Sequence, residues 1–263
     1  MSLHAAPMCP HNAAIAKASM ARSLKGIALV VTLGTLLSKA GGLVRQLVIA
    51  AAFGVGAAYD AYNYAYVLPG FLLILLGGIN GPFHSAMVSV LSRRPREEGA
   101  HILAALNTTV SALLLAVTVL LVLAADPLIT LVGPGLSPQL HAIAVVQLQV
   151  MAPMAFLAGL IGLGFGSLNA ADEFWIPAIS PLMSSLALMV GVGLLWWQLG
   201  GQIGAPSFAM VGGFVLAAAT LVGALAQWLI QLPALMRQGL VRFKLVWDWT
   251  HPGVREVWRV MGP

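Results

Sequence analysis

Long apolar runs without a single charged residue dominate the pattern of this chain. No Asp, Glu, Lys or Arg occurs at positions 61–92, 99–125, 127–171 and 174–236. A helix needs roughly 20 apolar residues to cross a bilayer, so the last two runs are each long enough for two crossings or for a crossing plus a loop. Breaks at Pro, Gly and charged residues predict six membrane-spanning helices, at about 24–54, 58–92, 99–124, 139–171, 174–198 and 207–236.

The composition also indicates a membrane protein. Of the 263 residues, 60% are hydrophobic and 8% are charged, whereas soluble domains carry about a quarter charged residues. The predicted fold is therefore all-α, a polytopic bundle of six transmembrane helices over residues 24–237. The single cysteine, Cys9, allows no disulfide framework or Cys-based metal site. Neither a metal-spaced His pair nor a grouping of nucleophile, base and orienting residue is found, so no enzyme, cofactor or metal is expected.

The cations outside the first predicted helix predict the orientation of the chain. They form clusters before the first helix, after the second and after the sixth: Lys17, Arg22 and Lys25; Arg93, Arg94 and Arg96; Arg237, Arg242, Lys244, Arg255 and Arg259. Six crossings place all three clusters on one side, which the positive-inside rule assigns to the cytoplasm together with both termini. The formal net charge of +5 is thus interpreted as a topology signal, and no nucleic acid is expected as a partner.

The two ends of the chain lie outside the predicted bundle. Residues 1–23 are Ala-rich, lack periodicity and are expected to form a disordered cytoplasmic tail. A signal peptide with its cleavage site at Ser38-Lys39-Ala40 is the alternative, but a charged residue lies inside that site and hydrophobicity resumes at once beyond it. Residues 238–263 predict a cytoplasmic loop and a short amphipathic helix with Val254 and Val257 on its apolar face, which is typical of a helix lying at the membrane interface.

Two cations lie inside the first predicted helix, where lipid offers them no partner. Lys39 and Arg45 interrupt an apolar stretch that runs from Gly26 to Phe53. A Lys or Arg near the centre of a spanning helix costs roughly 2.5 to 3.5 kcal/mol on insertion scales. Such residues usually face a watery cavity, a counter-ion or an anionic ligand. Both follow a stripe of polar and small residues at helical spacing, which also contains Thr32, Thr35, Ser38, Gly42 and Gln46.

We interpret this stripe as an inward-facing anion site. Arg45 is the stronger candidate, because a guanidinium binds phosphate oxygens through two hydrogen bonds, whereas Lys39 acts as a point charge. The alternative is structural: the two cations extend to the head groups or form an ion pair with Asp60.

The second predicted helix carries the residues of a hinge. Pro69 should kink it, and Gly77 and Gly78 should break it again before Pro82. Irregular backbone at membrane depth survives only where it is buried in protein or lines a cavity, as in transporter sites. Pro69, Gly70, Gly77 and Gly78 are therefore the predicted hinge.

Polar residues of the same helix complete the predicted site. Asp60 begins it, and Asn63 and Asn80 are further polar positions along it. Asn63 shares a face with Tyr59, Tyr66 and Gly70 at helical spacing. Aromatic anchors at the level of the head groups are the alternative interpretation of that face.

Two other features indicate packing. His84 is interpreted as a hydrogen-bonded packing residue rather than a proton carrier. The glycines of the fourth predicted helix indicate surfaces for close helix contact: Gly159, Gly162, Gly164 and Gly166.

Four segments of the chain are similar to a known transporter family: TLLSKAGGLVRQLVIAAAFGVGAAYDAYNYAYVLP, SLNAADEFWIPAISP, QLPALMRQG and VWRVMGP. They resemble the MurJ (MviN) lipid II flippases of the MOP exporter superfamily, from about Leu24 to the C-terminus. The resemblance implies a bacterial inner-membrane protein with two six-helix lobes around a central cavity, which moves an undecaprenyl-linked peptidoglycan precursor between leaflets. It further implies that Lys39, Arg45 and Asp60 match cavity and hinge positions.

The chain also departs from the family pattern. Gln46 stands where the family usually has an acidic residue, Leu73 and Ile74 stand where it has a basic pair, and an amide near Asn80 takes a further acidic position. Only the first lobe is matched, so a second six-helix lobe is expected as a partner, from a separate chain or by self-association.

From this resemblance, the leading hypothesis for the function is a flippase lobe that moves lipid II, a lipid-linked diphosphate, across the inner membrane. Membrane lipids are the other expected partners. Two alternatives stay open. One is a MOP-type exporter of another solute or lipid-linked sugar, and the other is a non-transporting scaffold or degenerate paralogue.

Overall fold

The computed structural model describes residues 10–78, 81–241 and 245–261, with side chains except at residues 10–25 and 27. This part of the chain contains helices and connecting turns and no strand. Six of its segments are long and apolar enough to cross a membrane: Ala28–Phe53, Ala57–Leu91, Arg96–Leu123, Pro138–Ala170, Trp175–Gln202 and Pro206–Arg237. They match the six predicted helices closely, so the prediction of an all-α membrane bundle is confirmed.

Three of these spans are broken helices. The second consists of α2 (Ala57–Gly77) and α3 (Pro82–Leu91), the fourth of α6 (Pro138–Met151) and α7 (Met154–Ala170), and the sixth of α9 (Ala209–Leu229) and α10 (Gln231–Arg237). A proline lies at or just after each break, namely Pro82, Pro153 and Pro233. Its ring removes the N–H that a continuous helix requires and clashes with the preceding turn. The predicted break after Gly77 is therefore present, whereas α2 continues through Pro69.

The other three spans are single helices, α1 (Pro10–Phe53), α4 (Arg96–Leu123) and α8 (Trp175–Leu199). Between them lie α5 (Ala125–Val132) and two 3-10 turns, η1 (Gly200–Gln202) and η2 (Pro206–Phe208). The start of α1 at Pro10 differs from the expected disordered tail, because the Ala-rich residues 13–21 favour a helix. Residues 1–9 of that tail lie outside the described residues.

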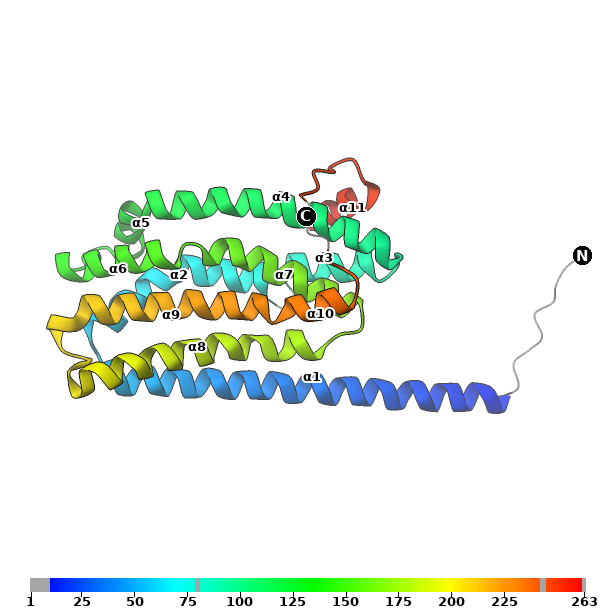
Figure 1. Cartoon of the computed structure of the whole chain (residues 1–263), viewed down its shortest axis with the longest axis horizontal. Coiled ribbons are helices and arrows are strands. Elements are labelled where there is room, and N and C mark those ends of the chain that lie inside the picture. Colours follow the sequence, from blue (N-terminus) through cyan, green and yellow to red (C-terminus); the bar gives the residue numbers. More distant parts are fainter. Residues whose placement is uncertain (1–9, 79–80, 242–244, 262–263) are drawn as a thin grey trace, which may run out of the picture.

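Helix α1 lies at the edge of the bundle, along α8 (Figure 1). Gly34 allows the two helices to approach, since a Cβ there would lie 2.9 Å from the Cβ of Ala178. One turn further on, Ser38 donates a hydrogen bond from Oγ to the carbonyl oxygen of Ala178 at 2.7 Å. Most other described residues of α1 are exposed. One side of α1 thus belongs to the lobe and the other side is open.

Helix α7 is the most enclosed element, and its glycines permit this. Its residues 157–168 are all buried. A Cβ at Gly162 would lie 1.9 Å from the carbonyl oxygen of Leu76, and a Cβ at Gly166 would lie 2.7 Å from that of His84. The predicted close packing is therefore confirmed. The interpretation of His84 as a packing residue also holds, because its ring is buried with Nε2 2.8 Å from Nδ2 of Asn169.

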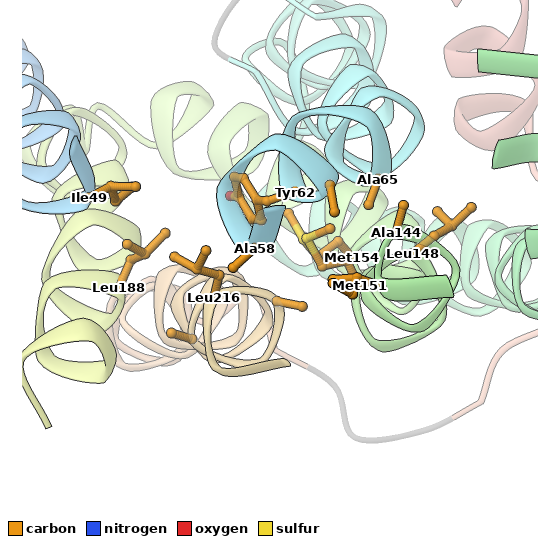
Figure 2. Packing of buried hydrophobic residues seen from close by; sticks show 14 of the residues in the cluster. Ile49, Ala58, Tyr62, Ala65, Ala144, Leu148, Met151, Met154, Leu188 and Leu216 are labelled. Atoms are coloured by element: carbon orange, nitrogen blue, oxygen red, sulfur yellow. The ribbon is translucent and has the colours of Figure 1, made fainter. Parts of the chain in front are cut away.

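The main hydrophobic cluster joins α1, α2, α5, α6, α7, α8 and α9, and Figure 2 shows part of it. Among its side chains are Ile49, Tyr62, Leu148, Met154, Leu188 and Leu216. Because lipid is as apolar as these side chains, the cluster is stabilised mainly by close packing rather than by exclusion of water.

A buried amide adds a polar link to this cluster. Gln147 of α6 is fully buried, and its Nε2 donates to the carbonyl oxygens of Ala58 at 3.1 Å and Gly213 at 3.0 Å. The side-chain amide of Gln147 thereby finds two carbonyl acceptors inside the bundle, near the starts of α2 and α9. Unpaired polar groups in hydrocarbon cost several kcal/mol each, roughly, so this residue fixes where the two helices meet α6.

The amphipathic helix predicted near the C-terminus is α11 (Pro252–Met261), and it packs against α3 and α4 (Figure 1). Val254 and Val257 are buried in a cluster with residues of α3 and α4, and Gly253 lies against Ile102. The apolar face of α11 therefore contacts protein, which differs from the expected position on lipid. The reason is that α3 and α4 expose an apolar surface that the sequence pattern of α11 alone does not reveal.

A group of ionisable side chains holds the segment before α11 and α11 itself to the start of α4. Nη2 of Arg94 lies 2.6 Å from Oε2 of Glu256, and Nη1 of Arg94 pairs with Glu98. Nε2 of His101 lies 2.9 Å from Oδ2 of Asp248. The hydrogen bond with His101, together with hydrogen bonds from Thr250, lowers the pKa of Asp248 to about 2. Asp248 therefore remains a carboxylate at neutral pH.

Candidate functional site

Lys39 and Arg45 lie on different faces of α1. They are six positions apart, so their side chains leave the helix about 120° apart. Lys39 is exposed, and no ion pair of its ammonium occurs among the described residues. Arg45 is half-buried. The structure thus separates two cations that the sequence pattern placed on one stripe.

Arg45 has hydrogen-bonding capacity that the described part of the chain leaves unused. Its Nε is buried and has no hydrogen-bond partner there. Arg45 lies one turn before Ile49, which belongs to the same packed cluster as Tyr62, so the guanidinium lies on the side of α1 that faces α2. Within the described residues Arg45 forms no ion pair with Asp60. The structural alternative, a direct ion pair between Arg45 and Asp60, is therefore not present in this conformation.

Three tyrosines of α2 form a stacked ladder near Arg45. The ring centroids of Tyr59 and Tyr62 are 6.2 Å apart and those of Tyr62 and Tyr66 are 5.5 Å apart, with interplanar angles of 19° and 18°. A Cβ at Gly70 would lie 2.4 Å from the ring of Tyr66, so this glycine makes room for the last ring. The ladder gives the site a fixed aromatic wall.

The middle ring of the ladder is anchored to α9. The hydroxyl oxygens of Tyr62 and Thr220 lie 3.0 Å apart, and Thr220 donates to the carbonyl oxygen of Leu216 at 2.6 Å. Because the hydroxyl hydrogen of Thr220 is used there, Tyr62 is the donor to Thr220. The two hydrogen bonds fix the ring and give a partner to both the Tyr62 and the Thr220 hydroxyl.

The other predicted site residues are more scattered. Asp60 lies half-buried in the first turn of α2, where a carboxylate is favourable beside the helix N-terminus. Asn63 is exposed, Ser38 is bonded to α8, and Asn80 lies outside the described residues. The structure therefore brings Arg45 together with the tyrosine ladder rather than with Ser38 or Asn63.

The predicted hinge residues fall into two pairs. Pro69 and Gly70 are buried within the continuous α2. Gly77 ends this helix, and Gly78 has an extended backbone with φ −77° and ψ 150°. The interruption of the backbone thus begins at the second pair only.

Sequence reasoning missed Tyr62 and Thr220 as parts of the site. The spacing of three and seven residues from Tyr59 to Tyr62 and Tyr66 would have indicated the ladder. Thr220 carries no such signal, because it lies 158 residues from Tyr62 in the chain.

The arrangement has a clear chemical preference. A half-buried guanidinium with an unpaired N–H at membrane depth favours an anionic oxygen, since lipid chains accept no hydrogen bond. In the described part of the chain no group of three or more His, Cys, Asp or Glu side chains is placed to hold a metal ion. The site is therefore suited to an anion.

The fold and this site define a polytopic helical membrane protein with broken spans and a half-buried cation on the open side of its lobe. The family model described as lipid II flippase MurJ matches residues 49–263. The chain belongs to this family.

Individual relatives agree with this assignment. The chain is 53% identical over 242 residues to a probable lipid II flippase MurJ of Synechocystis sp., covering 92% of this chain and 45% of the relative. It is 29% identical over 238 residues to the lipid II flippase MurJ of Burkholderia cenocepacia, covering 87% and 44%. The chain thus spans about half the length of the curated relatives it matches.

A solved structure has the same fold. It is a lipid II flippase MurJ in an inward closed conformation, with a TM-score of 0.70 and 21% sequence identity. The match covers 89% of this chain and 47% of that chain. The predicted six-helix lobe is confirmed by this likeness.

Proposed function

We propose that this chain is one lobe of a transporter that moves lipid II across the bacterial inner membrane for peptidoglycan synthesis. The observation that carries the proposal is Arg45, whose buried Nε lacks a partner within the described residues. The names of the relatives, lipid II flippases, support the same substrate. In this proposal Arg45 binds the diphosphate and the exposed Lys39 attracts it. The tyrosine ladder keeps the opposite wall rigid while the substrate passes, and no bond of the substrate is made or broken.

A second six-helix lobe completes the site in this proposal. Lys39 is exposed on a helix that crosses the membrane, and a charge facing lipid is costly. A second lobe opposite α1 and α2 would enclose Lys39, Arg45 and Asp60 in a shared aqueous cavity. The partial coverage of the relatives is compatible with this arrangement. The break at Gly77 and Gly78 would act as the hinge when the lobes move.

The proposed orientation places both termini in the cytoplasm, on the side of Arg93, Arg94 and Arg96. It is tested by single cysteines in a Cys9→Ser background, at Pro95 in the loop before α4 and at Gly135 in the loop before α6. In intact cells an impermeant maleimide should label position 135, and position 95 should react only after permeabilisation. Labelling of position 95 in intact cells would show that the orientation is the opposite of the one proposed.

Binding of undecaprenyl diphosphate to the reconstituted protein tests the anion site. Arg45→Ala removes a charge-assisted contact worth roughly 1.5 to 3 kcal/mol, so affinity should fall about ten- to a hundredfold. Arg45→Lys should recover part of the loss, because it keeps the charge without the planar fork. Leu47→Ala, which changes an exposed residue of the same helix outside the polar stripe, is the matched control. Melting temperatures are measured in parallel. If Arg45→Ala leaves binding intact and lowers only the melting temperature, Arg45 is a structural residue and the proposal fails.

A further inference from the structure

Residues 245–249, which precede α11, have side chains that alternate between the protein and the outside. The backbone N–H of Val246 donates to Oγ1 of Thr108 at 3.1 Å, and Asp248 is bonded to His101 at 2.9 Å. The residues between and beside them are exposed: Leu245 by 85%, Trp247 by 60% and Trp249 by 53%. Three large apolar side chains thus project from a segment whose inward residues are fixed to α4.

The partners on α4 place this segment within the thickness of the membrane. α4 has 28 residues, or about 42 Å at 1.5 Å per residue, which is close to the thickness of a bilayer with its head groups. Thr108 lies about 18 Å along this helix from Arg96 and about 10 Å from His101. Figure 1 shows the segment and α11 on the outer side of α4, toward its N-terminal end. Leu245 is therefore on the deeper side and Trp249 is nearer the charged end.

The exposed residue types match the layers of a lipid leaflet in this order. Leucine is favourable in hydrocarbon, and tryptophan is enriched at the interface with water. Arg255 donates from Nε to the carbonyl oxygen of Trp249 at 3.2 Å and is itself exposed, as is Arg259. Arg255 thus supplies positive charge beside Trp249, and Arg259 lies one turn further along α11. Positive charge of this kind is favourable at the level of lipid phosphates.

We propose that residues 245–249 insert into the leaflet at the Arg94 end of the lobe. Leu245 and Trp247 contact acyl chains and the interface, and Arg255 and Arg259 contact lipid phosphate groups. The apolar face of α11 is already buried against protein, so this segment, and not α11, makes the lipid contact. The insertion holds α11 against α4 at the membrane surface.

Collision accessibility of nitroxide labels tests this insertion. Single cysteines replace Leu245, Val246 or Trp247 in the Cys9→Ser full chain, which is reconstituted in vesicles of phosphatidylethanolamine and phosphatidylglycerol. Arg93→Cys serves as the water reference and Leu113→Cys, an exposed position nearer the middle of α4, as the lipid reference. Accessibility to oxygen reports lipid, and accessibility to a polar nickel chelate reports water.

The ratio of oxygen to nickel accessibility should be several-fold higher at positions 245 and 247 than at 93, and higher at 245 than at 247. Position 246 should be protected from both reagents. A ratio at 247 equal to that at 93 would overturn the proposal, because the segment would then lie in water. Protection of 245 and 247 from both reagents would also overturn it, because protein, such as a second lobe, would then cover the segment.

Discussion

Arg94 and Glu256 connect the start of α4 to α11, with Nη2 and Oε2 2.6 Å apart although 162 residues separate them in the chain. The same guanidinium pairs with Glu98, so one cation is shared between two carboxylates. The side chains of Arg94 and Glu256 are 22% and 42% exposed, and pairs of this kind usually contribute about 0.2 to 1 kcal/mol. The contact therefore positions α11 more than it stabilises the whole lobe.

Exchange of the two charges tests this positioning role. Arg94→Glu and Glu256→Arg should each increase hydrogen exchange of the α11 amides, because each places like charges together. The double exchange should recover part of the protection, since it restores the pair between α11 and α4. Protection of α7, measured in the same samples, should stay unchanged. An additive double variant would show that the two residues are not coupled.

A methyl group at Gly162 should destabilise the lobe. Its Cβ would lie 1.9 Å from the carbonyl oxygen of Leu76, so α2 and α7 must move apart. Overpacking of this kind costs about 1 to 3 kcal/mol. Gly193→Ala is the control, because nothing lies within 4 Å of a Cβ at that position of α8. Thermal unfolding in detergent should show a lower Tm for Gly162→Ala and an unchanged or higher Tm for Gly193→Ala. Equal effects would argue against close packing as the cause.

Removal of the Tyr62 hydroxyl should loosen the tyrosine ladder. Tyr62→Phe leaves the ring stack in place and deletes the hydrogen bond to Thr220, at a cost of about 0.5 to 1.5 kcal/mol. Tyr64→Phe changes an exposed tyrosine of the same helix and should leave the Tm unchanged. If both variants melt alike, the hydrogen bond between α2 and α9 contributes nothing measurable.

The spans of this lobe were predictable because hydropathy is a local property. The absence of charge in residues 127–171 indicates a membrane segment whatever its neighbours are, and Pro82 together with Gly78 indicates a break in the backbone. The need for small residues in α7 was equally visible, since four glycines recur within eight positions. Such features depend on residues close in sequence.

The contacts of each helix face were less predictable, because they depend on residues far away in the sequence. The sequence pattern predicted that Ser38 belongs to the anion site, but its hydroxyl donates a hydrogen bond to the carbonyl oxygen of Ala178 on α8. In the same way, the surface of α3 and α4 takes the apolar face that α11 would otherwise offer to lipid. Period and composition describe what a helix can bury. They do not reveal which neighbour buries it.

The segment before α11 should stay attached over the physiological pH range and loosen only in acid. The Oδ1 atom of Asp248 accepts hydrogen bonds from the backbone N–H groups of Thr250 at 3.2 Å and His251 at 3.0 Å. The pKa of this carboxyl is lowered from 3.8 to about 2, first by His101. A lowered pKa means that the charged form stabilises the folded state above the ordinary pKa, and that this contribution is lost as the pH falls through about 2.

Hydrogen exchange at the amides of Thr250 and His251, corrected for the intrinsic rate, measures this loss. Protection should be constant from about pH 8 to about pH 5 and should decrease between about pH 4 and pH 2. In the variant Asp248→Asn, protection should be lower at neutral pH and should not change in that acid range. The titratable side chains around Asp248 are His101 and His251, with Glu98 4.0 Å from His251. A loss of protection between about pH 7 and pH 5, where histidines ordinarily titrate, would identify the imidazoles and not Asp248 as the groups that hold the segment.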